Sequence, residues 1–440
     1  MTLFDLTSLP KINEKYQIFK SMTSETNMKD AKFLFSAKDN LTSKDMETCC
    51  GSKILEGYYP PFDATSVGDM KAAGGLLIGK TNMDEFGFGT FSTNSAFGVP
   101  KNPYDIDRSC GGSSGGAACA AAVMDGHISI GVSTGGSICG PASFCGIYGM
   151  VPTYGRVSRY GLLDCGNSLD KIGILSSKAT DMEKYIRIMA GPDQKDTTSC
   201  MQPEISKRRK LESVAVPEDI LDNVSEDVKK AFDDGLEILK EMGIDVKTVK
   251  MSSIKYAVPA YSVIATAEAS TNLARYCGMR YGQQKGDLSL KFDDYFTSFR
   301  SQYFGEETKK RILIGTYTRM AGLIDRYYNK ARMVRQLIID EYRSVLKEYD
   351  AILTPTMPFV SPKFTDVSKM SVVESYKTEI LTAPPNIAGM PHLSVPCGYD
   401  PNGMPIGMQF VADQWDEGLL FSTGEDWEKK FDLVKPEVSV

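Results

Sequence analysis

Histidine and tryptophan are the scarcest residues in this chain, with two of each in 440 residues. A Ser-His-Asp triad needs a histidine against the nucleophile and an acid behind it. His127 lies in the turn after an alanine-rich stretch, and His392 begins a short apolar run. Neither stands in a motif typical of such a triad, although a distant histidine could still fold back. The composition therefore disfavours a histidine-based hydrolase.

Cysteine pairs and long apolar runs are also missing. The ten cysteines stand singly apart from Cys49-Cys50, and no C-x-x-C pair occurs. This pattern disfavours a zinc site or a disulfide framework, so we expect free thiols and no bound metal. No stretch reaches the ~20 apolar residues of a membrane span. We therefore expect no transmembrane helix.

Excess positive charge is missing as well, because 50 Lys and Arg stand against 56 Asp and Glu, for a net charge of −6. Phosphate contacts demand basic patches, so we do not expect this chain to bind tRNA by itself. The dense basic run 207–210 (KRRK) is expected to be simply solvated.

Two serine-glycine clusters are the most informative feature that is present: GGSSGG at 111–116 and TGGS at 134–137. Glycine lets the backbone bend tightly, and a hydroxyl beside free N–H groups can combine a nucleophile with an oxyanion hole. Two other interpretations exist. Ser113 and Ser114 could cap the helix expected over 117–123. A phosphate-binding loop is a distant alternative, because no Gly-Lys-Ser/Thr run follows the glycines.

Lys38 is the candidate base for such a nucleophile. It ends the apolar segment Phe33-Leu34-Phe35-Ser36-Ala37, which predicts a buried strand. Burial disfavours the charged form of a lysine and makes it a usable base, and Ser-Lys pairs are a known variant of the triad. Taken alone, a lysine such as Lys38 is more often a surface residue at a strand end.

Taken in order, these residues resemble the amidase-signature family. The run that carries the resemblance is GGSSGGAACAAAVMDGHISIGVSTGGSICGPASFCGIYGMVP, at 111–152. Within that family, the chain resembles the A subunits of glutamyl-tRNA(Gln) amidotransferases in further segments from about Lys38 to the end. These segments are 51–65, 80–86, 154–161, 168–173 and 405–409.

The resemblance implies a serine–cis-serine–lysine triad. Ser137 would be the nucleophile, Ser113 the bridging serine and Lys38 the base. Ser113 follows Lys38 by 75 residues and precedes Ser137 by 24, which fits the family pattern. The N–H groups of Thr134, Gly135 and Gly136 would form the oxyanion hole.

The resemblance also implies a pocket for free glutamine. Arg311 would bind the carboxylate of the substrate, Glu379 its ammonium group, and Tyr261 would line the same pocket. The family has aspartate where this chain has Glu379. Judged alone, each charged residue would more often lie on a solvated helix face.

Two further positions depart from the family pattern inside the signature. Ser133 and Cys139 stand where the family usually has an acid and a base. We hypothesise that the family pair is a structural ion pair, whose joint loss is nearly neutral. Cys139 is expected to fill space in the core as a small side chain rather than to act as a nucleophile, because no histidine is placed to activate it.

The implied function is that of a glutaminase subunit, which supplies ammonia for converting Glu-tRNA(Gln) into Gln-tRNA(Gln). The implied partners are a B subunit, which uses ATP and magnesium, and a small third subunit. The tRNA would bind mainly through the partner, and this chain would hold no cofactor. A stand-alone amidase acting on small or fatty amides and a non-catalytic scaffold protein stay open as alternatives.

The resemblance implies an α/β fold in which one mixed β-sheet is flanked by helices on both faces. We expect a single domain over 1–440, with the core signature at 74–175. A βαβ-like segment at about 205–255 is expected to lie on the main sheet as a peripheral unit. The short stretch before Lys38 resembles the fungal mitochondrial form, which implies the mitochondrial matrix, with the cytoplasm as alternative. Residues 1–20 are poor in arginine and make a weak transit peptide.

Overall fold

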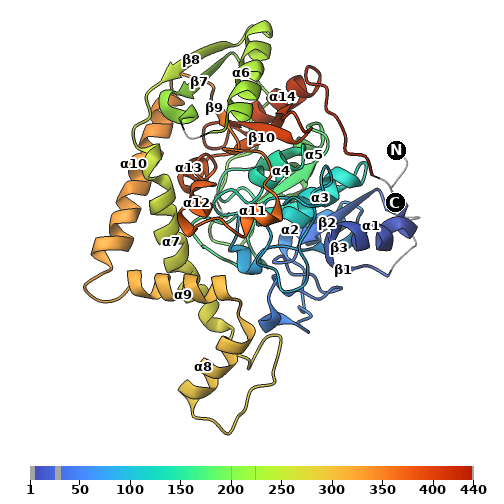
Figure 1. Ribbon diagram of the computed structural model, residues 1–440, viewed down its shortest axis with the longest axis vertical. Helices are drawn as coiled ribbons and strands as arrows, with labels where there is room; N and C mark the ends of the chain where they lie inside the picture. The colour runs from blue at the N-terminus through green and yellow to red at the C-terminus, as the bar shows by residue number, and fades with distance from the viewer. Residues whose placement is uncertain (1–4, 25–30, 200, 223, 439–440) are drawn as a thin grey trace.

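An eleven-stranded mixed sheet runs through the molecule (Figure 1). The computed structural model describes residues 5–24, 31–199, 201–222 and 224–438. The strand order is β1-β3-β2-β4-β6-β5-β10-β11-β9-β7-β8. The strands are β1 (Phe19–Met22), β2 (Phe33–Lys38), β3 (Gly75–Thr81), β4 (Ile128–Ser133), β5 (Tyr148–Val151), β6 (Lys171–Ser176), β7 (Ser213–Pro217), β8 (Asp245–Val249), β9 (Ala351–Pro355), β10 (His392–Tyr399) and β11 (Pro405–Val411).

Helices cover both faces of this sheet, as expected. They are α1 (Leu9–Tyr16), α2 (Thr65–Ala72), α3 (Gly115–Val123), α4 (Cys139–Phe144), α5 (Asp181–Met189), α6 (Glu226–Glu241), α7 (Ala257–Asn272), α8 (Phe292–Tyr303), α9 (Glu306–Thr318), α10 (Lys330–Val345), α11 (Phe364–Val367), α12 (Val372–Lys377), α13 (Ala383–Ala388) and α14 (Glu417–Glu428). Side chains alternate between the two faces along each strand. Phe33 and Phe35 belong to the core cluster that includes residues of α2, α5, α6 and α14, whereas Leu34 belongs to the cluster with residues of α1, α3 and α4.

Parallel pairing places the end of β2 beside the end of β4. The two strands run parallel, with Ala37 opposite Ile130. Every residue of both strands is buried. Because the carboxyl ends of neighbouring parallel strands meet at one edge, Lys38 and Ser133 lie together there.

The segment at 205–255 contains the expected βαβ unit, but its expected position is wrong. β7 pairs in parallel with both β8 and β9. The unit therefore extends the main sheet at its edge instead of lying on it. The reason is a long-range pairing of β7 with β9, which local periodicity does not specify.

The basic run at 207–210 is not simply solvated, contrary to expectation. The guanidinium groups of Arg208 and Arg209 each form ion pairs with two carboxylates. The acidic partners come from well-separated segments and are Glu183, Glu425, Asp350 and Asp416. The run therefore joins α5, α14 and the residue before β9.

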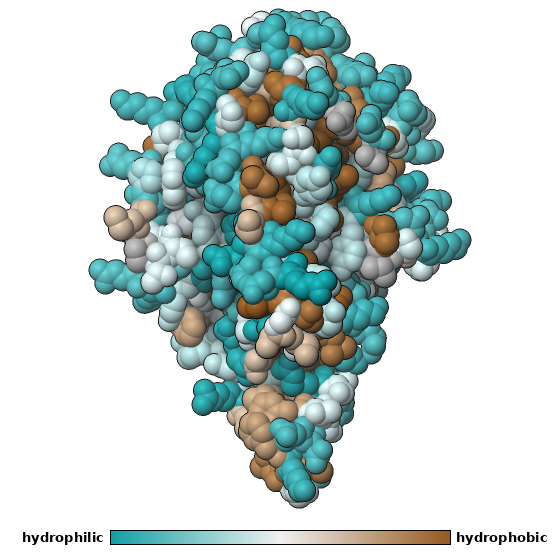
Figure 2. Space-filling model, turned by 90° about the vertical axis from the view of Figure 1, so that its left-hand side faces the viewer, coloured by the Kyte–Doolittle hydropathy of each residue, from teal (hydrophilic) through white to brown (hydrophobic). Residues whose placement is uncertain are grey.

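A helical flank built from α7, α9 and α10 lies to the left in Figure 1, and α8 projects below it. Figure 2 faces this side and shows apolar side chains among polar ones. Four large apolar residues of α9 and α10 are more than half exposed: Leu313, Tyr317, Met333 and Leu337. Within the described residues, no helix is long and apolar enough to cross a membrane.

Candidate active site

Lys38 is buried at the end of β2, with 1% of its surface exposed. Its Nζ donates hydrogen bonds to Ser113 Oγ at 2.7 Å and to the carbonyl oxygen of Val132 at 3.0 Å. Burial lowers the pKa of Lys38 to about 8, against the opposing charge of Asp84. At a pH slightly above 7, a substantial fraction of this amine is therefore uncharged. The interpretation of Lys38 as a surface residue is wrong.

Ser113 follows a cis peptide bond from Gly112. It is 1% exposed, and its Oγ accepts the hydrogen bond from Lys38. Ser114 occupies the N-cap position of α3 without a capping hydrogen bond from its side chain. Its Oγ donates instead to the carbonyl oxygen of Val132 at 3.2 Å. The side chain of Ser113 therefore contacts the end of β2 and that of Ser114 contacts the end of β4, and the Ser114 side chain does not cap the helix.

The loop of residues 134–137, here called the nucleophile loop, joins β4 to α4. Thr134 Oγ1 donates to Asp170 Oδ1 at 2.7 Å. A Cβ on Gly135 would lie 2.4 Å from the ring of Tyr261, and a Cβ on Gly136 would lie 2.3 Å from Thr382 Oγ1. Only glycine fits such contacts. Two other parts of the chain therefore clamp the loop.

The nucleophile loop presents free backbone donors. Within the described chain, no acceptor takes the N–H of Gly135, Gly136 or Ser137. Ser137 is 4% exposed and follows the same sheet edge that Lys38 occupies. Buried N–H groups without acceptors suit a developing oxyanion. The structure brings Lys38 and Ser113 into contact, whereas Ser137 makes no hydrogen bond to either in the described chain.

Both histidines lie in other hydrogen-bond networks. His127 Nε2 pairs with Ser36 Oγ at 3.0 Å, and burial lowers the pKa of His127 to about 3. His392 contacts the carbonyl oxygen of Met390 at 3.0 Å and Asn386 Nδ2 at 3.3 Å. A histidine that stays neutral and is bound elsewhere does not activate Ser137, so the lysine remains the candidate base.

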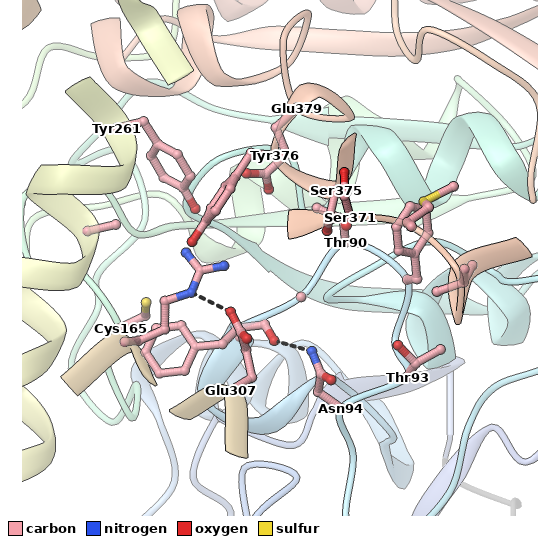
Figure 3. Close-up of a pocket in the computed structure, with 18 residues that line it drawn as sticks. Thr90, Thr93, Asn94, Cys165, Tyr261, Glu307, Ser371, Ser375, Tyr376 and Glu379 are labelled. Atoms are coloured by element: carbon pink, nitrogen blue, oxygen red, sulfur yellow. Dashed lines mark hydrogen bonds and ion pairs between the residues drawn. The ribbon is translucent and has the colours of Figure 1, made fainter. Parts of the chain in front are cut away.

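A cavity of about 210 Å³ lies beside the nucleophile loop and is lined by Tyr261, Arg311 and Glu379 (Figure 3). Ser113 and Ser137 do not line it themselves. Gly87 does, and a Cβ on Gly87 would lie 3.5 Å from Ser113 Oγ. Tyr261 also lines the cavity while it packs on Gly135. The cavity therefore adjoins the serine cluster through these two residues.

The charged residues of the cavity are well covered, so the interpretation as a solvated helix face is wrong. Glu379 is 8% exposed, and the side chain of Arg311 is 14% exposed. Burial raises the pKa of Glu379 to about 7, against the attraction of Arg311. The cavity thus combines a guanidinium with a carboxyl group that ionises near neutral pH.

Comparison with known proteins assigns the family. Residues 33–421 match the protein-family model described as Amidase. The chain belongs to the amidase family. It is 39% identical to the A subunit of the glutamyl-tRNA(Gln) amidotransferase of Clostridium botulinum (strain Eklund 17B / Type B), over 98% of this chain and 93% of that protein. The corresponding A subunit of Clostridium novyi (strain NT) is 37% identical, over 96% of this chain and 92% of that protein.

A solved structure agrees. The crystal structure of the A subunit of glutamyl-tRNA(Gln) amidotransferase from Thermotoga maritima matches this amidase with a TM-score of 0.84 at 36% identity. The match covers 99% of this chain and 94% of that one. The amidase α/β fold expected from the sequence is therefore confirmed.

Ser133 and Cys139, the two unusual signature positions of this amidase, have separate partners. Ser133 Oγ donates to Asn386 Oδ1 at 3.0 Å. Cys139 is buried, its Sγ lies 3.6 Å from the carbonyl oxygen of Gly149, and burial raises its thiol pKa to about 12. A protonated, buried thiol agrees with a packing role for Cys139.

Sequence reasoning missed two buried acids of this amidase, Asp84 and Asp170. Asp84 accepts hydrogen bonds from the N–H groups of Ser92 and Asn94, both at 2.9 Å, and so holds a loop that lines the cavity. Asp170 anchors Thr134. Burial raises the pKa of both acids to about 6. Asp84 lies three residues after β3 and Asp170 directly precedes β6, positions that carry no signal of this role in the sequence.

Glu85, next to Asp84, holds the start of α9. Its carboxylate accepts hydrogen bonds from Gly305 N–H at 2.8 Å, from Thr308 Oγ1 at 2.6 Å and from Ser52 Oγ. An acid at a helix N-terminus satisfies free N–H groups there. Because α9 carries Arg311, Glu85 also fixes the cavity. Among the described residues, no group of histidine, cysteine and acidic side chains could hold a metal ion.

Proposed function

We propose that this amidase is the glutamine-hydrolysing A subunit of a glutamyl-tRNA(Gln) amidotransferase. The observation that carries the proposal is the buried hydrogen bond between Lys38 and Ser113 beside the nucleophile loop. Bacterial relatives of that name at 37–39% identity support it. The cavity also supports it, because one guanidinium and one carboxyl group suit the carboxylate and ammonium of a free amino acid.

The proposed reaction begins with neutral Lys38. The carbonyl oxygen of Val132 can only accept, so it takes one N–H of the neutral amine, and the nitrogen lone pair can then accept the O–H of Ser113. Lys38 takes the proton of Ser113, and Ser113 takes the proton of Ser137. A hydrogen bond between Ser113 and Ser137 would form when substrate binds, because catalytic hydrogen bonds often become short only in the substrate complex.

Ser137 Oγ then attacks the carboxamide carbon of glutamine. The N–H groups of Thr134, Gly135 and Gly136 would hold the oxyanion, and each such donor contributes about 3–4 kcal/mol to lowering the barrier. The proton returns through Ser113 to the nitrogen, and ammonia leaves. Water then attacks the acyl-enzyme with the same base, releasing glutamate and restoring Ser137.

The decisive experiment is ammonia release from glutamine. We expect the wild-type chain, alone or with co-expressed partner subunits, to release ammonia and the Ser137→Ala variant to release none above background. Faster hydrolysis of acetamide or a fatty amide than of glutamine would favour a stand-alone amidase. Glutamine-dependent tRNA amidation that survives Ser137→Ala would favour a non-catalytic scaffold.

We also propose that the chain works in a hetero-oligomer with a B subunit and a small third subunit. The B subunit would use ATP and magnesium, and the tRNA would bind mainly through that partner. The net charge of −6 supports this division, and so do the large exposed apolar side chains of α9 and α10, since such surface often marks an interface. Co-purification of a tagged chain from its native cells tests the assembly.

A mitochondrial matrix location is a separate proposal, supported by the resemblance to the fungal mitochondrial form, with the cytoplasm as alternative. The relatives compared above are bacterial. Cell fractionation with a matrix marker and protease protection decides between the two compartments.

A further inference from the structure

Glu307 is a third charged residue of the cavity, and the reaction above does not use it. It lines the cavity one helical turn before Arg311 on α9. Its Oε1 accepts a hydrogen bond from Arg311 Nε at 2.7 Å (Figure 3). The Glu307 side chain is 27% exposed, and its other oxygen lies 3.8 Å from the exposed Lys310. The charged side chains that line the cavity are thus Glu307, Arg311 and Glu379.

The guanidinium of Arg311 is held on several sides. Besides the bond to Glu307, it lies over the ring of Tyr376 at 4.9 Å and near that of Phe88 at 5.9 Å. Within the described chain, neither Nη of Arg311 donates a hydrogen bond. Because Glu307 occupies the Nε side, the Nη edge is the part of the fork left for a substrate carboxylate.

The charge of the cavity follows from these contacts. Arg311 brings one positive charge, which the negative charge of Glu307 already balances. In Figure 3, Glu307 lies below Tyr261, Tyr376 and Glu379. The guanidinium of Arg311 contacts both Glu307 and the ring of Tyr376. An incoming carboxylate therefore meets a guanidinium that is shared with one acid and near a second.

We propose that Glu307 is a specificity-determining residue that restricts the cavity to amides carrying both an α-carboxylate and an α-ammonium. This inference rests on the proposed function. A zwitterion completes two pairs, with its carboxylate on Arg311 and its ammonium on Glu379, and adds no net charge. An amide with the carboxylate alone puts a second anion beside the shared guanidinium and leaves Glu379 without a partner, which is repulsive.

The test compares Glu307→Gln with wild type on two substrates. Glutamine is the zwitterion, and 4-carbamoylbutanoate is the same amide without the α-amino group. Glutamine at position 307 can still accept the Arg311 Nε bond through its carbonyl oxygen, so the variant removes charge but keeps geometry. Glu306→Gln is the matched control, because Glu306 is 83% exposed and pairs with Lys309 outside the cavity.

We expect Glu307→Gln to lower the kcat/KM preference for glutamine over 4-carbamoylbutanoate by about five- to tenfold, the size of one partly buried charge interaction. The change should come from a lower KM for 4-carbamoylbutanoate, with kcat nearly constant. Glu306→Gln should leave the preference unchanged. An unchanged preference in Glu307→Gln, or an equal loss on both substrates, would overturn the proposal.

A second readout separates this inference from the proposed function. In the Ser137→Ala background, calorimetry measures binding of the two intact amides with and without Glu307→Gln. If wild type releases no ammonia from glutamine under any condition, the proposed function fails. The binding preference still tests Glu307: a shift toward 4-carbamoylbutanoate supports the charge argument, and the lack of a shift refutes it.

Discussion

Lys38 and Ser113 stand 75 residues apart in the sequence and share a buried hydrogen bond of 2.7 Å. The bond joins the end of β2 to the turn before α3. Both residues are 1% exposed, and so a proton can pass between them with little competition from solvent. The relation makes the amine of Lys38 the first target for mutation.

Replacing Lys38 with methionine removes the amine and keeps most of the side-chain volume. We expect kcat for glutamine hydrolysis to fall by about 10²–10⁴-fold, the usual contribution of a general base. Lys171→Met is the matched control. Lys171 is equally buried on β6, and its Nζ makes a 3.4 Å hydrogen bond to Met390, so we expect that variant to keep activity within about tenfold of wild type. A loss below tenfold in Lys38→Met would contradict the role of the base.

The pH dependence of kcat should follow Lys38. Burial lowers the pKa of Lys38 to about 8, and only the neutral amine is a base. The neutral fraction grows as pH rises, so kcat should increase from pH 6 and level off above about pH 9. A stopped ammonia assay across this range measures the profile. A kcat that is flat or falls over the same range would show that no neutral amine is required.

The pH dependence of glutamine binding should be set by a different group, Glu379. Burial raises its pKa to about 7, and only the ionised form attracts an ammonium. KM for glutamine should therefore fall as pH rises through about 7. Glu379→Gln should abolish this dependence and raise KM, while the rise of kcat with pH remains. If KM keeps its pH dependence in Glu379→Gln, a group other than Glu379 must cause that dependence.

Gly136→Ala should damage catalysis through geometry. The new Cβ would lie 2.3 Å from Thr382 Oγ1, which is buried, so the nucleophile loop must shift. Misplacement of about 1 Å can cost about 100-fold in rate, and we expect kcat to fall by about that factor. Gly191→Ala is the control, because nothing lies within 4 Å of its Cβ position. Similar activity in both variants would mean that the loop tolerates displacement.

A stability prediction concerns Arg156 and Glu417, a nearly fully buried ion pair with an N–O distance of 2.9 Å. Glu417→Gln leaves the guanidinium charge without its counterion and should lower the free energy of unfolding by about 3–5 kcal/mol. Glu237→Gln breaks an exposed pair with Lys240 and should cost about 0–1 kcal/mol. Chemical denaturation measures both. Equal effects would mean that burial does not strengthen the pair.

Local patterns were enough to predict the strand ending at Lys38, the βαβ unit within 205–255 and the glycine loops. Each depends on neighbours within a few residues. The edge position of β7 and β8 was not predictable in this way, since it depends on pairing with β9 more than 130 residues later. The contact of Gly136 with Thr382 has the same long-range character.

Arg311 and Glu379 were found from their flanking sequence, not from their own type. Glu307 was missed because an acid four residues before an arginine on a helix is usually a surface pair. The structure makes this one a cavity pair by burying Arg311 against Tyr376 and Phe88. Asp84 was missed since an isolated acid carries no sign of the N–H groups that surround it.

The carboxylate of Glu85 ties the start of α9, the helix that carries Arg311, to the loop after β3. Anyone exchanging α9 between relatives, to redirect such an enzyme to another amide, would have to carry over Thr308 and the glycine before it. Without those two residues the transferred helix would lie in a different position, and its arginine would not reach the substrate carboxylate.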